Sequence, residues 1–377
     1  MTPAEKVARL RLARSEGIGP VTLARLLGRF GSAEAAIEAL PRLARAGGAK
    51  AAPSLAPQAK AEDEIAKIQK LGGRLLVLGE DDYPPLLAEL PDPPAALSVL
   101  GEPRHLAARA VALVGARNAS INGQRVAATL ASDLARAGLC VVSGLARGVD
   151  AAAHVAALDA GGLTVAAVAG GIDKPYPSEN AALQRRIAEA GAVLAEAPLG
   201  TEPQSKHFPR RNRLIAGLAL GVVVVEAAPK SGSLITARLA LEQGRELFAV
   251  PGSPLDPRAR GANDLIRQGA HLTESADDVL ANLPDSPRRE GLARLPLFAR
   301  GPAPVRAEED LAPPPAPDET DSARPQIIDL LGPSPVPIDE LLRRANISAA
   351  ALAEVLLELD LAGRLERLPG NRVALIA

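Results

Sequence analysis

From residue 111 onward, short apolar runs rich in valine alternate with longer segments of helical periodicity, and this alternation restricts the fold more than any other feature. The runs predict strands at residues 111–114, 140–143, 163–168, 192–196, 221–226 and 246–250. The segments between them predict helices at residues 122–137, 149–160, 179–190, 210–219 and 233–243. Strands that alternate with helices form a parallel sheet covered on both faces, so we expect an α/β fold with an extended Rossmann-like sheet.

Loops that follow the strands are the candidate site, because such sheets bind ligands at the carboxyl ends of their strands. Two consecutive loops, 115–120 and 143–148, each contain glycine and one arginine, and each opens a helix. Glycine lets the backbone approach a ligand, helix N-termini favour anions, and arginine can hold a phosphate with two hydrogen bonds. The spacing matches neither the dinucleotide fingerprint nor the Walker loop. We therefore predict phosphate-binding loops without a nucleotide motif.

The later loops add basic, hydroxyl and aromatic residues at the same edge. They span residues 170–177, 208–213, 226–233 and 251–254. Positive charge at the start of the predicted helix 210–219 opposes the helix dipole, and a bound anion would explain it. The sequence thus predicts a basic rim made of Arg117, Arg147, Lys174, Lys206, Arg210, Arg211, Arg213 and Lys230.

Residues 4 to about 70 predict a small N-terminal helical domain of the SAM or helix-hairpin-helix type, with helices at 4–15, 21–30, 33–39 and 58–70. The turn at residues 16–20, EGIGP, joins two of these helices. Its amides could hold a nucleic-acid phosphate, or its glycines could only make a tight turn before Pro20 starts a helix. The sequence leaves both interpretations open. Residues 74–100 predict two further strands that extend the sheet.

The C-terminal part begins with a linker, because nine prolines lie between residues 281 and 324. Helices at 325–331, 338–345 and 349–361, followed by a hairpin across 363–376 that turns at 369–371, predict a winged-helix domain. The third helix contains no Lys or Arg, so phosphate repulsion argues against its insertion into a DNA groove. We expect the domain boundaries 1–72, 73–283, 284–324 and 325–377.

Composition limits the partners and the compartment. A net charge of −1 gives no long-range attraction for a polyanion, so local basic patches must hold one. The single cysteine, Cys140, lies in a predicted buried strand, which excludes an intrachain disulfide and disfavours thiolate chemistry. No signal-peptide core or membrane-span stretch is found, so we expect a cytoplasmic protein. Aromatic residues make up 2%, which limits base stacking to a few positions such as Tyr176 and Phe208.

Six motifs between residues 74 and 280 stand in a fixed order: VALVGARNAS, VVSGLARGVDAAAH, GGIDKPYP, FPRRNRLIAGLALGVVVVEA, SGSLITARLALEQGRELFAVPGS and GANDLIRQGA. Together they resemble the DNA-processing protein A family (DprA, also called Smf). The resemblance implies a DNA-binding protein, without cofactor, metal or catalysis, that protects incoming single-stranded DNA and loads the RecA recombinase onto it during natural transformation. It also implies a homodimer formed through the Rossmann-like domain, no membrane association, and DNA contacts at Arg117 and Lys206.

The loop sequences and the family resemblance together predict one set of DNA-binding residues in these loops. Separate arginines and amide-rich loops suit a chain of phosphates better than one compact pyrophosphate. No pattern for reading base edges is visible, so we expect binding to be independent of DNA sequence. The nominated residues are Gly115, Arg117, Ser120, Ser143, Gly144, Arg147, Gly148, Lys174, Lys206, Phe208, Arg211, Asn212, Arg213, Ser231, Gly232 and Ser233.

Several of these predicted DNA-binding residues could have a structural role instead. Arg117 and Arg147 could instead pair with a neighbouring carboxylate such as Asp150 or Asp173. Asp150 lies four residues before His154 on one helix face, but no nucleophile accompanies this pair, so we favour a structural role.

Two further positions have alternative interpretations. Asn212 and Arg213 could tie loops together. The apolar run 214–225 suggests a sheet edge through which two copies pair, with burial in the core as the alternative.

Two rival functions come from other classes of protein. A Rossmann-like nucleotide hydrolase of the lysine-decarboxylase-like type carries the element P-G-G-x-G-T-x-x-E, whereas residues 231–237 read SGSLITA, without the catalytic glutamate. A mononucleotide-sensing domain would bind one nucleotide saturably. Affinity for oligonucleotides of increasing length separates both from a strand-binding protein.

Overall fold

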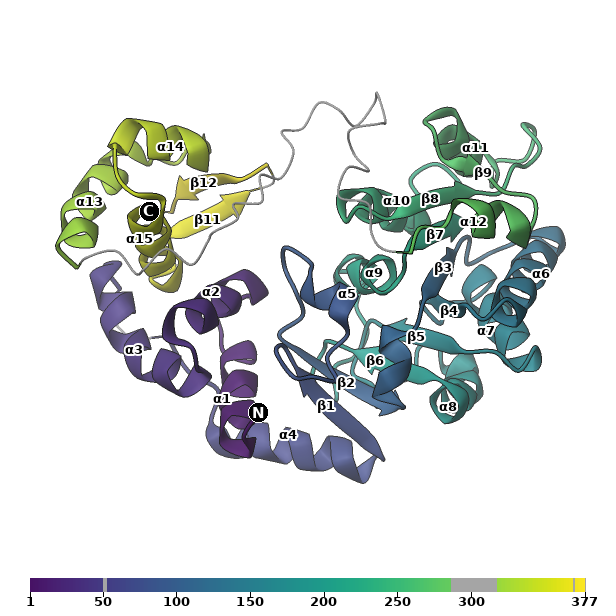
Figure 1. The fold of residues 1–377 in the computed structure, drawn as a ribbon, viewed down its shortest axis with the longest axis horizontal. Coiled ribbons are helices and arrows are strands. Elements are labelled where there is room, and N and C mark those ends of the chain that lie inside the picture. Colours follow the sequence, from purple (N-terminus) through teal and green to yellow (C-terminus); the bar gives the residue numbers. More distant parts are fainter. Residues whose placement is uncertain (50–52, 286–316, 369, 377) are drawn as a thin grey trace. The chain divides into compact units, whose positions relative to one another are not determined.

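The computed structural model describes residues 1–49, 53–285, 317–368 and 370–376. Its contacts divide the chain into two compact units, both visible in Figure 1. One consists of residues within 1–62 and 300–377, and the other of residues within 63–299. The second unit contains the alternating strands and helices.

A nine-stranded sheet forms the centre of the 63–299 unit, in the order β1-β2-β6-β5-β4-β3-β7-β8-β9. All pairings from β6 to β9 are parallel, which confirms the six predicted strands and their direction. Strands β1 and β2 add to the edge as predicted, but antiparallel, so a wholly parallel sheet is wrong there. The strands are β1 (Gly73–Val77), β2 (Ala96–Gly101), β3 (Ala110–Val114), β4 (Cys140–Ser143), β5 (Thr164–Val168), β6 (Ala192–Ala195), β7 (Gly221–Val224), β8 (Glu246–Ala249) and β9 (His271–Leu272).

The antiparallel edge follows from the short connection between its strands. A parallel pair needs a crossover long enough for a helix that spans the sheet. Between β1 and β2 the chain forms only turns and α5 (Pro85–Ala88). Tyr83 Oη closes this connection by donating to the Pro94 carbonyl at 2.6 Å.

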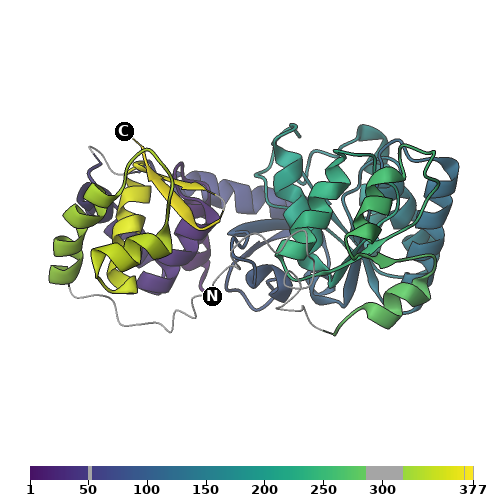
Figure 2. The same cartoon turned by 90° about the horizontal axis from the view of Figure 1, so that it is seen from above.

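Helices cover both faces of the sheet (Figure 2). Successive side chains of β3 point to opposite faces of the sheet. Val111 and Leu113 pack in one core, and Ala112 and Val114 pack in the other. The first core lies under α6 (Ile121–Arg136), α7 (Val149–Asp159) and α12 (Ala276–Asn282), and α8 (Ala181–Ala190) continues this layer. The second lies under α9 (His207–Leu218), α10 (Gly232–Glu242) and α11 (Arg260–Arg267). The remaining turns are η1 (Pro103–Ala107) and η2 (Ser178–Asn180).

The apolar run 214–225 belongs to the core of this unit. It fills the end of α9 and the whole of β7, and β7 is paired on one side with β3 and on the other with β8. Leu214, Ala216 and Val223 are buried. The interpretation of this run as a sheet edge is therefore wrong, and the alternative of a buried core is confirmed.

The other unit begins with α1 (Pro3–Ala13), α2 (Pro20–Phe30) and α3 (Ala33–Ala46), while α4 (Gln58–Lys70) leads into β1. Side-chain caps define where α1 and α3 begin, because the Thr2 hydroxyl accepts from the Glu5 amide and the Ser32 hydroxyl accepts from the Ala35 amide. The third helix runs past its predicted end at residue 39, through Pro41. Burial of Leu40 and Leu43 stabilises the added turns.

The C-terminal part of this unit has the predicted winged-helix arrangement of α13 (Pro317–Leu330), α14 (Ile338–Ala345), α15 (Ala349–Leu361) and a small sheet of β10 (Val336–Pro337), β11 (Leu365–Leu368) and β12 (Arg372–Leu375). The first helix starts at Pro317, not at the predicted Pro325, so residues 317–324 are helical and not part of the linker. Ala323 is buried and Arg324 donates to Glu358, which stabilises these turns. The predicted linker residues 286–316 lie outside the described residues.

Candidate nucleic-acid interface

The nominated loops meet at the carboxyl ends of the parallel strands, as the topology requires. The strand order reverses between β3 and β7, and the loops that follow these two strands diverge there. Such a reversal is where open α/β sheets commonly hold ligands. The loops after β4, β5 and β6 continue the same edge.

One amide of the first loop already binds a carboxylate of the protein. Glu226, at the end of β7, accepts from the Ser120 amide at 2.9 Å and from the Ser120 hydroxyl at 2.5 Å. The same hydroxyl caps α6 by accepting from the Gly123 amide at 2.9 Å. A phosphate at this helix N-terminus would have to displace Glu226, so the geometry does not support the predicted role of Ser120 as a phosphate ligand.

The amides of the second loop also donate to a carboxyl group of the protein. Asp150 accepts from the Gly144 amide at 3.1 Å and from the Ala146 amide at 3.3 Å. Ser143 is fully buried and donates to the Leu113 carbonyl, and Gly144 is also buried. Direct DNA contact at Ser143 and Gly144 is therefore not supported, and both residues instead build the loop.

Glycines at two of the nominated positions let the two loops pack against each other. Gly148 has a φ of +74°, and a Cβ there would overlap the carbonyl of Ala116. A Cβ at Gly115 would overlap the side chain of Val149. Both glycines bring the first loop close to the start of α7, which holds the exposed Arg117 in place.

Three nominated residues at the start of α9 are buried and hold other segments. Arg211 donates through Nη1 to the carbonyls of Gly144 and Ala167, the latter at 2.7 Å, and burial lowers its pKa to about 10. Asn212 donates to the Gly232 carbonyl at 3.3 Å.

Arg213 fixes the β1–β2 connection to α9. It donates to the Asp92 carbonyl at 2.8 Å and to the Glu196 carboxylate at 2.7 Å. The alternative role of Asn212 and Arg213, tying loops together, matches this geometry. Contact between DNA and these buried side chains stays a prediction that the geometry does not favour.

An aromatic pair with cations around it lies at the centre of the edge. The rings of Phe208 and Tyr176 are 5.7 Å apart between centroids and tilted by 56°. The Arg117 guanidinium carbon lies 4.6 Å from the Phe208 centroid, within the range of a cation–π contact. Arg211 lies 5.9 Å from the same centroid. Tyr176 is 49% exposed, so its ring is accessible to a ligand.

Apart from the buried Arg211, the cations of the predicted rim fall into two classes. Four are in ion pairs: Arg147 with Glu179, Lys174 with Glu202, and both Arg210 and Arg213 with Glu196. Three exposed ones, Arg117, Lys206 and Lys230, form no ion pair with any described residue. Neither Asp150 nor Asp173, the partners considered for Arg117 and Arg147, forms an ion pair with them. The carboxylates that pair with the rim are Glu179, Glu202 and Glu196.

The loop before α10 contributes hydroxyls next to the buried Asn212. The side chains of Ser231 and Ser233 hydrogen-bond to each other, and Gly232 begins the helix. Ser233 is buried, whereas Gly232 and the neighbouring Lys230 are exposed. Contact between DNA and residues 231–233 stays a prediction.

Asp150 and His154 do not form an acid–base pair. His154 Nδ1 lies 2.7 Å from the Thr164 hydroxyl, which itself donates to the Val141 carbonyl. Burial lowers the pKa of His154 to about 3, and burial also raises the pKa of Asp150. Both side chains are inaccessible, which agrees with the structural role that the sequence favoured.

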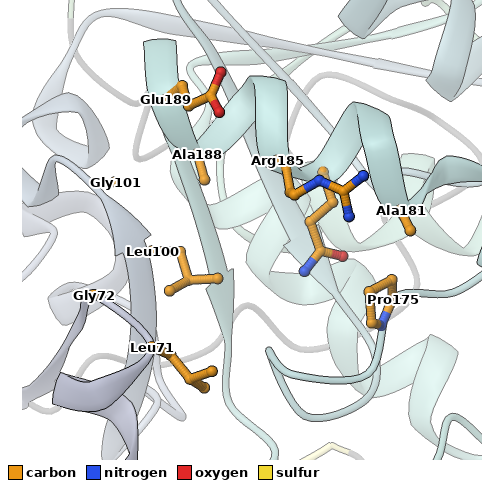
Figure 3. Close-up of a pocket in the computed structure, with 10 residues that line it drawn as sticks. Leu71, Gly72, Leu100, Gly101, Pro175, Ala181, Arg185, Ala188 and Glu189 are labelled. Atoms are coloured by element: carbon orange, nitrogen blue, oxygen red, sulfur yellow. The ribbon is translucent and has the colours of Figure 1, made fainter.

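A shallow pocket lies alongside α8 (Figure 3). Its lining is mainly apolar, with Leu71, Leu100 and Pro175 among its residues and Arg185 and Glu189 as its charged ones. None of the unpaired cations lines it. Among the described residues there is no group of three metal-ligating side chains. No helix in the described part of the chain is long and apolar enough to cross a membrane.

Comparisons with known proteins show the family of this chain. The family model described as DNA recombination-mediator protein A matches residues 74–284, the DprA-like N-terminal HHH domain matches 3–66, and the DprA winged helix domain matches 311–371. Protein Smf of Escherichia coli K12 is 38% identical over 322 residues, which cover 85% of this chain and 82% of that protein.

Two solved structures of DNA processing protein A are also similar. The one from Streptococcus pneumoniae has 41% identity and a TM-score of 0.58, and the match covers 61% of this chain and 80% of that one. The one from Helicobacter pylori, which describes single-stranded DNA binding, has 31% identity and a TM-score of 0.50, with 55% and 95% covered. The chain therefore belongs to the DNA recombination-mediator protein A family.

Proposed function

We propose that the chain binds single-stranded DNA along the carboxyl edge of its nine-stranded sheet, without sequence preference, and acts as a recombination mediator. The observation that carries this proposal is the aromatic pair Tyr176–Phe208, of which Tyr176 is exposed, beside Arg117, which forms no ion pair with any described residue. Membership of the family supports it, as does the single-stranded DNA binding of the Helicobacter pylori relative.

Side chains, and not loop amides, hold the phosphates in this proposal. Glu226 accepts from one amide of the first loop and Asp150 from two amides of the second, so a compact pyrophosphate there would meet two carboxyl groups. Arg117, Lys206 and Lys230 come from three different loops and are exposed. Separate cations of this kind suit successive phosphates of one strand.

The aromatic pair stacks with bases. Every base has a π face, so stacking on Phe208 and Tyr176 is tolerant of sequence. A duplex keeps its bases stacked inside, whereas a single strand can turn them toward these rings. This difference is the reason that we assign single-stranded DNA to the site.

Binding, and not catalysis, is the proposed activity. The titratable pair Asp150 and His154 is buried and engaged in structural hydrogen bonds. The loop at residues 231–237 lacks the glutamate that the hydrolase alternative needs. Nothing in the described residues favours that alternative over strand binding.

Three further properties rest on the family alone. We infer that the chain works as a homodimer through its Rossmann-like unit, that it loads RecA onto the strand, and that it does so in the cytoplasm. The division at residues 72 and 283 is likewise kept as a proposal, whereas residues 317–324 belong to α13 and not to the linker. Light scattering of the full chain at micromolar concentration tests the dimer, since a monomer mass throughout would contradict it.

An oligonucleotide length series tests the proposed function. The full chain is titrated with one mononucleotide and with single strands of increasing length at fixed salt. Affinity should rise with length until the edge is filled, because each added phosphate meets another cation. Saturable binding of the mononucleotide, with no gain from added length, would support the hydrolase or sensor alternatives and refute the proposal.

A further inference from the structure

The third helix of the winged helix, α15, is covered by the N-terminal helices of the same unit. In DNA-binding winged helices the corresponding helix enters the major groove. Here α15 packs against α2 and α3, next to which Figure 1 draws it. The surface that would read DNA is therefore an internal interface.

Polar contacts fix the direction of this interface. Thr22, in the first turn of α2, donates to Asp360 near the end of α15 at 2.8 Å. Arg29, in the last turn of α2, forms an ion pair with Glu354, nearly two turns earlier in α15. The two helices therefore run antiparallel, and their polar side chains match in register.

Close backbone contact adds a steric element at the end of α3. A Cβ on Gly47 would overlap the carbonyl of Glu358. Gly47 has a φ of −72°, so its backbone conformation does not itself require glycine. The close approach of α15 is the reason that no side chain fits here. Arg364 donates to the Gly47 carbonyl at 3.3 Å and closes the same contact.

The buried carboxylates of α15 are paired within this unit and are unfavourable for DNA. Glu354 is 8% exposed and pairs with Arg29 of α2, across the interface. Glu358 is 3% exposed and pairs with Arg324 of α13, within the winged helix. Leaving the buried Glu354 without its partner is costly, so the contact between α2 and α15 is specific and not incidental.

We propose that α15 is the docking surface for α2 and α3 of the same chain, which makes the N-terminal helices and the winged helix one closed module that keeps α15 off DNA. This inference goes beyond the proposed function, since it concerns the unit that does not carry the cationic edge. The acidic row of α15 takes the place that a DNA-reading helix gives to basic residues.

Disulfide trapping in the full chain tests the docking. Thr22→Cys with Asp360→Cys places two thiols at a hydrogen-bonded position, and the only native cysteine, Cys140, is buried. Mild oxidation should produce a cross-linked monomer whose rate of formation is independent of protein concentration. The control pair, Glu38→Cys with Asp339→Cys, joins two exposed residues and should cross-link at least about tenfold more slowly, because docking supplies the effective concentration.

Two glycines of the N-terminal domain provide a matched comparison. Gly47→Ala introduces the overlap with Glu358 and should slow trapping on the order of tenfold. Gly28→Ala, in α2 with open space around it, should leave the rate unchanged. A charge swap distinguishes loss of docking from misfolding. Arg29→Glu should slow trapping, and the additional substitution Glu354→Arg should restore the rate because it restores the ion pair.

Each other outcome overturns the inference. Equal trapping of the test and control pairs would mean that the helices do not dock. A cross-linked dimer would mean that the partner is a second copy. The trapped monomer should bind single strands within about twofold of the reduced protein, and a larger loss would show that α15 or α2 contacts DNA. Trapping is read without DNA, so its failure is distinct from failure of the proposed function.

Discussion

Replacement of Arg117 by alanine, compared with Arg147 by alanine, separates a DNA-binding cation from a structural one. Both arginines are exposed and lie in neighbouring loops of the same edge. Arg147 donates to both oxygens of Glu179, at 2.6 and 2.8 Å, whereas Arg117 has no carboxylate partner in the described residues and lies over Phe208. Because Glu179 already occupies the guanidinium of Arg147, this side chain is not free to hold a phosphate, and we expect its contribution to DNA binding to be small.

The expected change in the salt dependence of DNA affinity follows from counterion release. Each cation that neutralises one phosphate of a single strand contributes about −0.7 to the slope of log affinity against log salt. Between 50 and 200 mM salt, one contact therefore accounts for roughly a 2.6-fold change in affinity. Arg117→Ala should reduce the slope by about 0.7 and weaken binding to all DNA sequences alike, while Arg147→Ala should change the slope by less.

The assay is a fluorescence anisotropy titration of labelled single strands at four salt concentrations. Thermal unfolding controls for the fold, which should be unchanged because both side chains are exposed in loops. Equal slopes for Arg117→Ala and the unmodified chain, in a properly folded variant, would refute the assignment of Arg117. A larger effect from Arg147→Ala would show that its ion pair with Glu179 opens on binding.

Three further outcomes are expected. Phe208→Ala should cost roughly 1–3 kcal/mol of single-strand affinity through lost stacking, and a change below this range would exclude a bound base. The folded pKa of His154, about 3, lies below its unfolded value, so stability should fall as pH drops below about 6.5; His154→Asn should flatten this dependence in urea unfolding, and an unchanged dependence would contradict its buried neutral state. A chain ending at residue 316 should keep single-strand affinity within about tenfold, and a greater loss would place DNA contacts on the winged helix.

The sheet could be predicted because its information is local. Valine-rich runs and helical periodicity identify each element from its own residues, and the topology then brings the loops to one edge. The antiparallel edge and the helix through Pro325 could not be predicted, since they depend on tertiary contacts such as that of Arg324 with Glu358.

The site was predictable in position but not in detail. Residue type and loop placement do not reveal which carboxylate pairs with which cation, because Glu179, Glu196 and Glu202 are distant in the sequence from the cations that they pair with. The burial of Arg211 could not be predicted from the sequence either, because its guanidinium donates to carbonyls of two other segments. The positive start of α9, which suggested a bound anion, instead reflects these internal contacts.

Photo-cross-linking tests the central claim, that the strand lies on the carboxyl edge of the sheet, most directly. A single strand that carries 5-iododeoxyuridine is irradiated in complex with the full chain, and the attached peptides are identified by mass spectrometry. We expect attachment at Tyr176 or Phe208, the aromatic pair beside Arg117. Attachment confined to peptides from residues 1–49 or 317–376 would contradict it.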